Sequence, residues 1–218
     1  MQADAHVLGI NLGQLGYLAE VEPTGWEQAL AGYFAGEHST TERLLVAAHL
    51  TPPPSPGADE ETEGQRLWGT LPSALNEVVI EKQAMGRTVR LGVSIDGEFF
   101  TNYVADGVII ATPTGSTAYS LSARGPIVAP THRALLLTAV SPHSLFDRSL
   151  VLEPSSTVVV EVLGDRAAAV AVDGEHIRVL PPGATVTVAA DPRPARFVTF
   201  GGQDFHRILK AKFGLNDR

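Results

Sequence analysis

Short apolar runs separated by turn residues dominate the second half of the chain, and this pattern predicts β-strands. Residues 89–95 alternate apolar with other side chains, and Asp96-Gly97 is a hairpin signal before a second run at 98–104. Asp173-Gly174 is a similar signal after residues 168–172. Strands at this spacing favour packed antiparallel sheets, so we expect an α+β fold class that is mostly β. Further runs of strand length lie at 7–10, 43–50, 108–111, 135–140, 158–162, 177–179, 186–189 and 196–200.

Apolar residues at helical spacing predict two helices, one near each end of the chain. The segment Thr24-Gly25-Trp26-Glu27 has the form of a capping box, in which the Thr24 hydroxyl and the Glu27 carboxylate satisfy the first backbone N–H groups. We expect this first helix to end near Gly36. The apolar face of the first helix consists of Trp26, Ala29, Leu30, Tyr33 and Phe34. The apolar face of the second helix consists of Phe205, Ile208, Leu209 and Phe213.

Residues 51–64 cannot contribute to a core, because they include four prolines, four acidic residues and no large apolar side chain. We interpret them as a mobile loop between strands rather than a domain boundary. Their four acids account for half of the formal net charge of −8 that 16 Lys and Arg and 24 Asp and Glu produce over 218 residues.

Composition excludes several classes of protein. The chain has no cysteine, which excludes a disulfide scaffold, a thiolate zinc site and a cysteine nucleophile, and fits a cytoplasmic location. The acidic balance argues against nucleic acid as a partner. The longest uncharged run, residues 107–123, is interrupted by Pro113 and Gly115, so we expect no membrane span. No pair among the seven histidines has metal-binding spacing, so we expect no metal-ligating residues.

Residues 112–120, Thr-Pro-Thr-Gly-Ser-Thr-Ala-Tyr-Ser, form the most unusual stretch and directly follow an apolar strand. Ser116 or Thr117 can cap a helix whose free N–H groups suit a phosphate or a polar base edge. Tyr119 offers a face on which adenine can stack. The stretch is neither a P-loop nor a nucleophile elbow. From these residues alone, a capped helix start without a ligand is the simpler interpretation.

Other polar positions allow two interpretations each. Asn76-Glu77 precedes an apolar run, so the amide can read a base edge and the carboxylate can accept from ribose hydroxyls, but the pair can also be an ordinary strand end. Asp106-Gly107 can be a turn, and we interpret Asp173-Gly174 as a turn only. The glycines of residues 9–16 depart from a dinucleotide fingerprint, because Asn11 replaces a glycine, and predict a structural turn.

Taken in order along the chain, these stretches resemble the NAD kinase family. The matching segments are Leu8 to Leu18, Ala74 to Val78 and, most specifically, Asp106 to Ser120. Residues 142–145 and 172–174 also fit. The resemblance implies transfer of a phosphate from ATP or polyphosphate to the adenosine-ribose 2′-hydroxyl of NAD, giving NADP, with a divalent metal, usually magnesium. It also implies a homodimer or homotetramer.

The resemblance assigns binding roles to the positions that match the family's motifs. Asn76, Thr117 and Tyr119 would surround the adenine. Glu77 would hold the ribose, and Asp106 would lie on the nicotinamide side, in some members from a neighbouring subunit. The full set of implied cofactor-binding residues is Asn76, Glu77, Arg87, Asp106, Thr117, Ala118, Tyr119, Ser120 and Ser122.

The resemblance also divides the chain into parts. Residues 1–42 would be the C-terminal remnant of an α/β domain, residues 43–200 an antiparallel two-sheet NAD-binding domain, and residues 201–218 a helix that packs back on the α/β part. The family's Gly-Gly-Asp-Gly-Thr motif, whose aspartate accepts the proton from the 2′-hydroxyl, is expected upstream of Met1. We therefore expect a truncated kinase, or alternatively a non-catalytic NAD- or NADP-binding paralogue.

Arg124 is a second departure, because the family usually has two glycines in the matching segment, 122–126. A Cβ at this position can block a backbone conformation with positive φ. Alternatively, the guanidinium can contact a phosphate.

Overall fold

The computed structural model describes residues 5–12, 18–54, 68–201 and 204–215. These residues fall into two compact units. Unit 1 comprises the described parts of Met1–Arg43, Ala129–Thr131 and Arg193–Arg218, and unit 2 comprises those of Leu44–Val128 and His132–Pro192. Two predicted features lie outside the described residues: Gly13 and Gly16 of the N-terminal turn, and most of the acidic loop.

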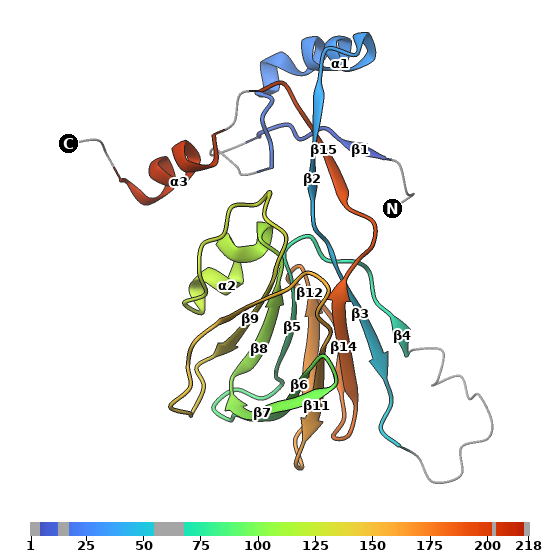
Figure 1. Ribbon diagram of the computed structural model, residues 1–218, viewed down its shortest axis with the longest axis vertical. Helices are drawn as coiled ribbons and strands as arrows, with labels where there is room; N and C mark the ends of the chain where they lie inside the picture. The colour runs from blue at the N-terminus through green and yellow to red at the C-terminus, as the bar shows by residue number, and fades with distance from the viewer. Residues whose placement is uncertain (1–4, 13–17, 55–67, 202–203, 216–218) are drawn as a thin grey trace. The chain divides into compact units, whose positions relative to one another are not determined.

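Unit 1 contains a three-stranded sheet in the order β1 (His6–Val7), β15 (Ala195–Thr199) and β2 (Ser39–Arg43). β15 runs parallel to β1 and antiparallel to β2 (Figure 1). The predicted β-rich domain, 43–200, included β15, but this strand finds its partners in unit 1. The predicted buried strand at 7–10 is wrong beyond β1, because Ile10 forms only an isolated bridge to Val21 and is 40% exposed.

The two predicted helices are present in unit 1 as α1 (Trp26–Ala35) and α3 (Phe205–Phe213). The predicted capping box of α1 is wrong, because Thr24 lies inside the 3-10 turn η1 (Pro23–Gly25) and Gly25 takes the N-cap position. The predicted end of α1 is confirmed, because Gly36 is its C-cap, at φ 76°. Gly214 is the C-cap of α3, at φ 62°. At the start of α3, the Asp204 carboxylate accepts the His206 N–H at 2.9 Å.

Unit 2 consists of two six-stranded antiparallel sheets, which confirms the predicted fold class. The sheet built around β5 and β8, called here the β5–β8 sheet, has the order β10 (Leu150–Leu152), β9 (Leu135–Val140), β8 (Gly107–Ala111), β5 (Glu77–Lys82), β12 (Ala168–Val172) and β13 (Glu175–Leu180). The other, the β6–β11 sheet, has the order β4 (Gly69–Thr70), β3 (Val46–Thr51), β14 (Thr185–Ala190), β11 (Val158–Leu163), β6 (Val89–Ile95) and β7 (Glu98–Ala105).

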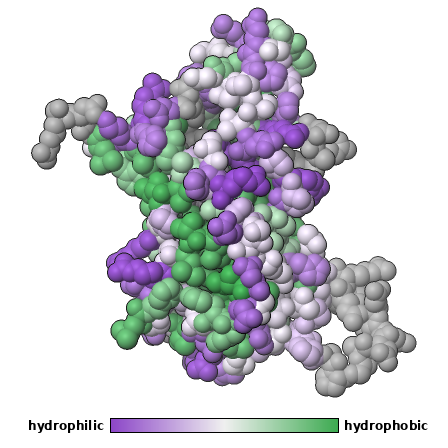
Figure 2. Space-filling view, viewed as in Figure 1, coloured by the Kyte–Doolittle hydropathy of each residue, from purple (hydrophilic) through white to green (hydrophobic). Residues whose placement is uncertain are grey.

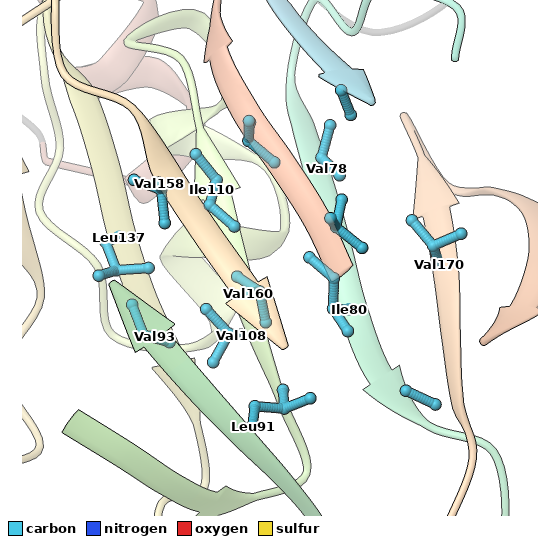
Figure 3. Packing of buried hydrophobic residues seen from close by; sticks show 14 of the residues in the cluster. Val78, Ile80, Leu91, Val93, Val108, Ile110, Leu137, Val158, Val160 and Val170 are labelled. Atoms are coloured by element: carbon cyan, nitrogen blue, oxygen red, sulfur yellow. The ribbon is translucent and has the colours of Figure 1, made fainter. Parts of the chain in front are cut away.

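The main core lies between the facing sides of these sheets, as expected for alternating strands in a sandwich. Figure 3 shows that side chains of both sheets point into the same space. The side chains named below are each 1% exposed or less, and burial of such side chains supplies the main stabilisation of unit 2. They include Val78, Ile80, Val108, Ile110 and Leu137 of the β5–β8 sheet, and Leu91, Val93, Val158 and Val160 of the β6–β11 sheet.

Both predicted Asp-Gly hairpins are confirmed. Asp96 and Gly97 join β6 to β7 with φ of 52° and 85°, and Asp173 and Gly174 join β12 to β13 with φ of 48° and 82°. Two successive positive φ angles define the turn whose twist matches that of antiparallel strands. The hairpins belong to different sheets, so the two turns share their geometry but not their surroundings.

Candidate functional site

The segment Leu75-Asn76 enters β5 and is held tightly by the turn that follows β8. Thr112 donates its N–H to the Asn76 carbonyl at 2.8 Å and its hydroxyl to the Leu75 carbonyl at 2.6 Å. The Thr112 hydroxyl also accepts the Gly115 N–H at 3.0 Å. These bonds bring two stretches that sequence analysis singled out, 76–77 and 112–120, into direct contact.

The turn itself is a 3-10 helix, η3 (Thr114–Thr117), followed by the four-residue helix α2 (Tyr119–Ser122). The predicted cap is wrong, because Ala118 is the N-cap of α2. The Ser116 hydroxyl lies 2.6 Å from the Pro113 carbonyl and accepts the Val128 N–H at 3.0 Å. The Thr117 hydroxyl donates to the Thr114 carbonyl at 3.3 Å. Both hydroxyls therefore hold the turn together, and one turn of helix is too short to support the predicted phosphate site.

Glu77 carries the least satisfied carboxylate near this turn. The residue is 5% exposed, and within the described part of the chain its Oε2 has no hydrogen-bond partner. Burial, reinforced by the charge of Asp173, raises the pKa of Glu77 to about 7, while the Tyr119 backbone N–H opposes the shift. The Thr114 hydroxyl is buried and likewise finds no partner among the described residues. Unpaired buried oxygens are costly, so each of these two oxygens is a candidate partner for a ligand hydroxyl.

Asp173 contacts the same segment from the other side, through three backbone N–H groups. Its carboxylate accepts from Leu75 and Asn76 at 2.7 Å each and from Glu77 at 3.0 Å. The sequence pattern predicts Asp173 as a turn residue only and does not predict these bonds. No local pattern signals them, because they join residues 96 to 98 positions apart.

Asp106 marks the passage of the chain from β7 in one sheet to β8 in the other, so the turn interpretation is wrong. Its backbone N–H donates to the Val140 carbonyl and its carbonyl accepts from the Lys82 N–H. Its carboxylate pairs with the Lys82 ammonium at 2.6 Å. Lys82, which no sequence pattern singled out, holds the Asp106 side chain in place.

Tyr119 joins these groups to an open pocket. Burial raises the pKa of its phenol, and the charges of Glu81 and Asp106 add to the shift. Tyr119 is 37% exposed, so part of the residue is available to a ligand. A pocket of about 480 Å³ adjoins it. The polar residues that line this pocket with Tyr119 are Ser122, Arg124, Ser141, Ser144 and Asp147.

The remaining implied residues are not all at this pocket. Thr117 and Ala118 are partly exposed in the turn, whereas Ser120 is fully buried with its Oγ 3.4 Å from the Thr138 hydroxyl. Arg87 lies in the loop between β5 and β6 and lines a second pocket of about 250 Å³ with Lys82 and Arg166. Among the described residues, no three His, Asp or Glu side chains come together as a metal-binding group. No helix in the described ranges is long and apolar enough to span a membrane.

Arg124 adopts φ 66° directly after α2, so the expectation that its Cβ blocks this conformation is wrong. Its N–H closes the turn by donating to the Leu121 carbonyl at 2.9 Å. The next residue must be glycine for a different reason, because a Cβ on Gly125 would lie 2.8 Å from the Ser120 carbonyl oxygen. Strain is thus stored at Arg124, at the rim of the pocket.

Replacing Arg124 with glycine is expected to raise the free energy of unfolding by about 1 kcal/mol, because glycine adopts positive φ without the clash of a Cβ. Urea unfolding of both proteins measures this difference. Arg148→Gly serves as the control, since Arg148 is exposed and has no positive φ. An unchanged or lowered stability of Arg124→Gly would show that the arginine side chain compensates for its strain.

Comparison with known proteins identifies the class. The family model described as the ATP-NAD kinase C-terminal domain matches residues 75–200, which include the whole site. Over 98% of its length the chain is 37% identical to NAD kinase 1 of Streptomyces coelicolor and 35% identical to an NAD kinase of Lachnoclostridium phytofermentans. The chain therefore belongs to the NAD kinase family. It spans 65% and 73% of the lengths of these two relatives.

Solved structures agree with this assignment. The crystal structure of yeast NADH kinase complexed with NADH matches 99% of this chain, and 60% of its own, with a TM-score of 0.86 and 29% identity. An NAD kinase from Archaeoglobus fulgidus in complex with ATP shares the fold, with a TM-score of 0.73 at 22% identity over 98% of this chain and 74% of its own.

Proposed function

We propose that the protein is an NAD kinase, which transfers a phosphate from ATP or polyphosphate to the adenosine-ribose 2′-hydroxyl of NAD and releases NADP. One observation carries the proposal beyond family membership. Two buried oxygens, Glu77 Oε2 and Thr114 Oγ1, lack partners among the described residues. The Glu77 carboxylate also interacts with the backbone N–H of Tyr119, a residue that is 37% exposed. Hydroxyls of a ribose would satisfy the carboxylate, and a base would cover the ring.

The proposal assigns binding roles to the residues around the turn after β8 and to Arg87. The Asn76 side-chain amide contacts the adenine, together with Thr117 and Tyr119. Glu77 accepts from ribose hydroxyls, and the Lys82-paired Asp106 lies on the nicotinamide side. Ala118 and Ser122 border the dinucleotide, and Arg87 contacts it from the second pocket. No described residue is assigned the proton transfer, which the family resemblance places on the aspartate of Gly-Gly-Asp-Gly-Thr.

A divalent metal such as magnesium would neutralise the phosphates of the donor. Because the described residues provide no three-carboxylate or histidine group, no step of the proposal is routed through the metal.

Assembly as a homodimer or homotetramer, and a cytoplasmic location, are further parts of the proposal that rest on the family resemblance. An exposed apolar patch supports the assembly, since large patches of this kind mark interfaces. Phe99, Phe100, Leu145 and Phe146 are 38% to 106% exposed, and the rings of Phe100 and Phe146 lie 5.7 Å apart. Figure 2 shows that apolar residues gather on the face of the protein that is turned to the viewer.

The direct test measures NADP formation by the purified 218-residue protein with NAD, ATP and magnesium, coupled to an NADP-specific dehydrogenase. Calorimetric titration with NAD and NADP runs in parallel. Sustained turnover supports the kinase. Binding without turnover would instead favour the non-catalytic paralogue, and the absence of both would contradict the proposal.

Tyr119→Ala is expected to weaken binding of NAD by about tenfold or more, because base–aromatic stacking contributes about 1–3 kcal/mol. Tyr119→Phe keeps the ring and should bind almost as tightly as the parent protein. Calorimetric titration measures both variants. Equal affinity of Tyr119→Ala and the parent protein would remove Tyr119 from the site.

A further inference from the structure

The carboxylate of Asp173 is surrounded by consecutive backbone N–H groups. Oδ2 accepts from Leu75 at 2.7 Å, and Oδ1 accepts from Asn76 at 2.7 Å and from Glu77 at 3.0 Å. The backbone N–H of Asp173 also donates to the Glu77 carbonyl at 3.0 Å. Successive N–H groups that converge on one anion form a strong and geometrically specific contact.

The segment needs such a partner, because it stands at the very start of β5. Glu77 is the first residue that pairs with β8, where it lies opposite Ala111. Leu75 and Asn76 precede the ladder, so their N–H groups find no partner in β8, and the Asp173 carboxylate satisfies them instead. Thr112 takes the two carbonyls of the same residues. The segment 75–77 is therefore fixed on one side by the end of β8 and on the other by the β12–β13 hairpin.

We propose that Asp173 is a positioning residue of the dinucleotide site, which fixes the backbone of Asn76 and Glu77 and thereby aims both side chains at the ligand. This inference rests on the proposed function, since it assigns Asp173 to the same site. Asp173 itself makes no contact with the reacting groups in this proposal. Its side chain acts through the three N–H groups that it binds.

The same carboxylate also acts on Glu77 through its charge. Within the described ranges, Glu77 interacts with Asp173 from the β12–β13 turn and with the phenol of Tyr119 from α2. Across the ladder, Ala111 carries no charge. After burial, Asp173 is the second cause of the raised pKa of Glu77, about 7. Removing the charge of Asp173 is therefore expected to shift the titration of Glu77, a change that loosening of the hairpin alone does not predict.

The test is Asp173→Asn, for which the hairpin should survive because Asn-Gly is the preferred pair for this turn. The asparagine Oδ1 can still accept from Asn76 and Glu77, but its amide group cannot accept from Leu75. We expect the dissociation constant for NAD above pH 7 to rise about tenfold, the effect of one lost charge-assisted hydrogen bond. We also expect the pH midpoint of binding to move below that of the parent protein, because removing the charge lowers the pKa of Glu77.

Asp96→Asn is the matched control. Asp96 has nearly the same backbone angle, φ 52°, and its carboxylate likewise binds a neighbouring loop, accepting from the Thr157 N–H at 2.8 Å and the Ser156 hydroxyl at 3.0 Å. This hairpin lies in the β6–β11 sheet, so Asp96→Asn should leave both the affinity and the pH midpoint unchanged. Asp173→Gly, which also permits positive φ, provides a second variant that should weaken binding in the same direction.

The outcomes separate this inference from the proposed function. Thermal unfolding first checks that the Asp173→Asn variant is folded. If this variant binds NAD as tightly as the parent protein does, with the same pH midpoint, the positioning role is wrong. An equal loss of NAD affinity in Asp173→Asn and Asp96→Asn would also overturn the positioning role, since such a loss would reflect a general loosening of hairpins. If the parent protein binds neither NAD nor NADP, the proposed function fails first. Weakened binding with a lowered midpoint in Asp173→Asn alone supports the inference.

Discussion

Replacing Gly115 with alanine is expected to abolish NAD binding and to lower the free energy of unfolding by about 3 kcal/mol or more, at the upper end of overpacking effects. An added Cβ would overlap the Asn76 carbonyl oxygen and lie 2.5 Å from the carbonyl carbon and 2.7 Å from Cα. These are backbone atoms, so no side-chain rotation relieves the clash. Either Asn76 moves, and with it Glu77, or the turn after β8 separates from β5.

Urea unfolding and calorimetric titration with NAD measure the two effects. Gly25→Ala is the matched control, because the nearest described atom, Val21 Cγ1, lies 4.0 Å from the added Cβ and the position has no positive φ. The control should unfold within about 1 kcal/mol of the parent protein, because Gly25 is the N-cap of α1 and alanine is a poorer N-cap than glycine. A Gly115→Ala protein that binds NAD normally would show that the close approach of the turn to Asn76 is not needed.

The sequence predicted strands and hairpins well where one local cause decides the structure. Asp96-Gly97 and Asp173-Gly174 form the expected hairpins, because both residues of each pair accept positive φ. Asp106-Gly107 has the same residues but leads from one sheet to the other. There glycine is required for space, since a Cβ on Gly107 would lie 2.7 Å from the Ile80 carbonyl oxygen. Identical dipeptides therefore differ in structure for reasons that only the packed sheets supply.

Capping predictions failed for a related reason. Thr24, Ser116 and Thr117 all have hydroxyls before apolar helical residues, and such hydroxyls commonly cap helices. In the structure each lies in a 3-10 turn, and Ser116 instead joins the turn to Val128, twelve residues further on. A hydroxyl can satisfy several competing backbone groups, and tertiary contacts decide among them.

The candidate site could be predicted in part. The polar residues that follow or precede apolar strands, together with the family resemblance, predicted Asn76, Glu77 and Tyr119 as site residues. The structure brings their segments together. Asp173 and Lys82 were missed, because their partners lie 97 and 24 residues away in the sequence. The unpaired oxygen of Glu77 depends on burial by α2 and the neighbouring strands, which no single-sequence pattern reveals.

Glu77→Gln is expected to weaken NAD binding about thirtyfold above pH 7, or by about 2 kcal/mol, because a carboxylate that accepts from ribose hydroxyls becomes a neutral amide. In the parent protein, affinity should fall as the pH drops through about 7, the pKa of Glu77, since the protonated acid is a poorer acceptor. In the variant this dependence should disappear. Calorimetric titration across that range measures both effects.

The same substitution should have the opposite effect on stability. The pKa of Glu77 is raised from its ordinary value to about 7. At a pH between the ordinary pKa and the raised one, Glu77 holds its proton in the native state but has lost it in the unfolded state. Ionisation of Glu77 therefore costs the parent protein stability as the pH rises through this window, and Glu77→Gln avoids that cost. We expect the variant to be more stable by about 2 kcal/mol at about pH 8, with the difference vanishing toward about pH 5.

Thermal unfolding at both pH values measures this difference. Glu161→Gln, at an exposed position of β11 in the other sheet, should change neither stability nor affinity. A single buried carboxyl would thus weaken the fold under the conditions in which it binds the ligand, as is common for groups held ready for function. If Glu77→Gln kept the parent protein's pH profile of binding, another group would be responsible for the titration, and the unpaired Oε2 would not be the ribose acceptor.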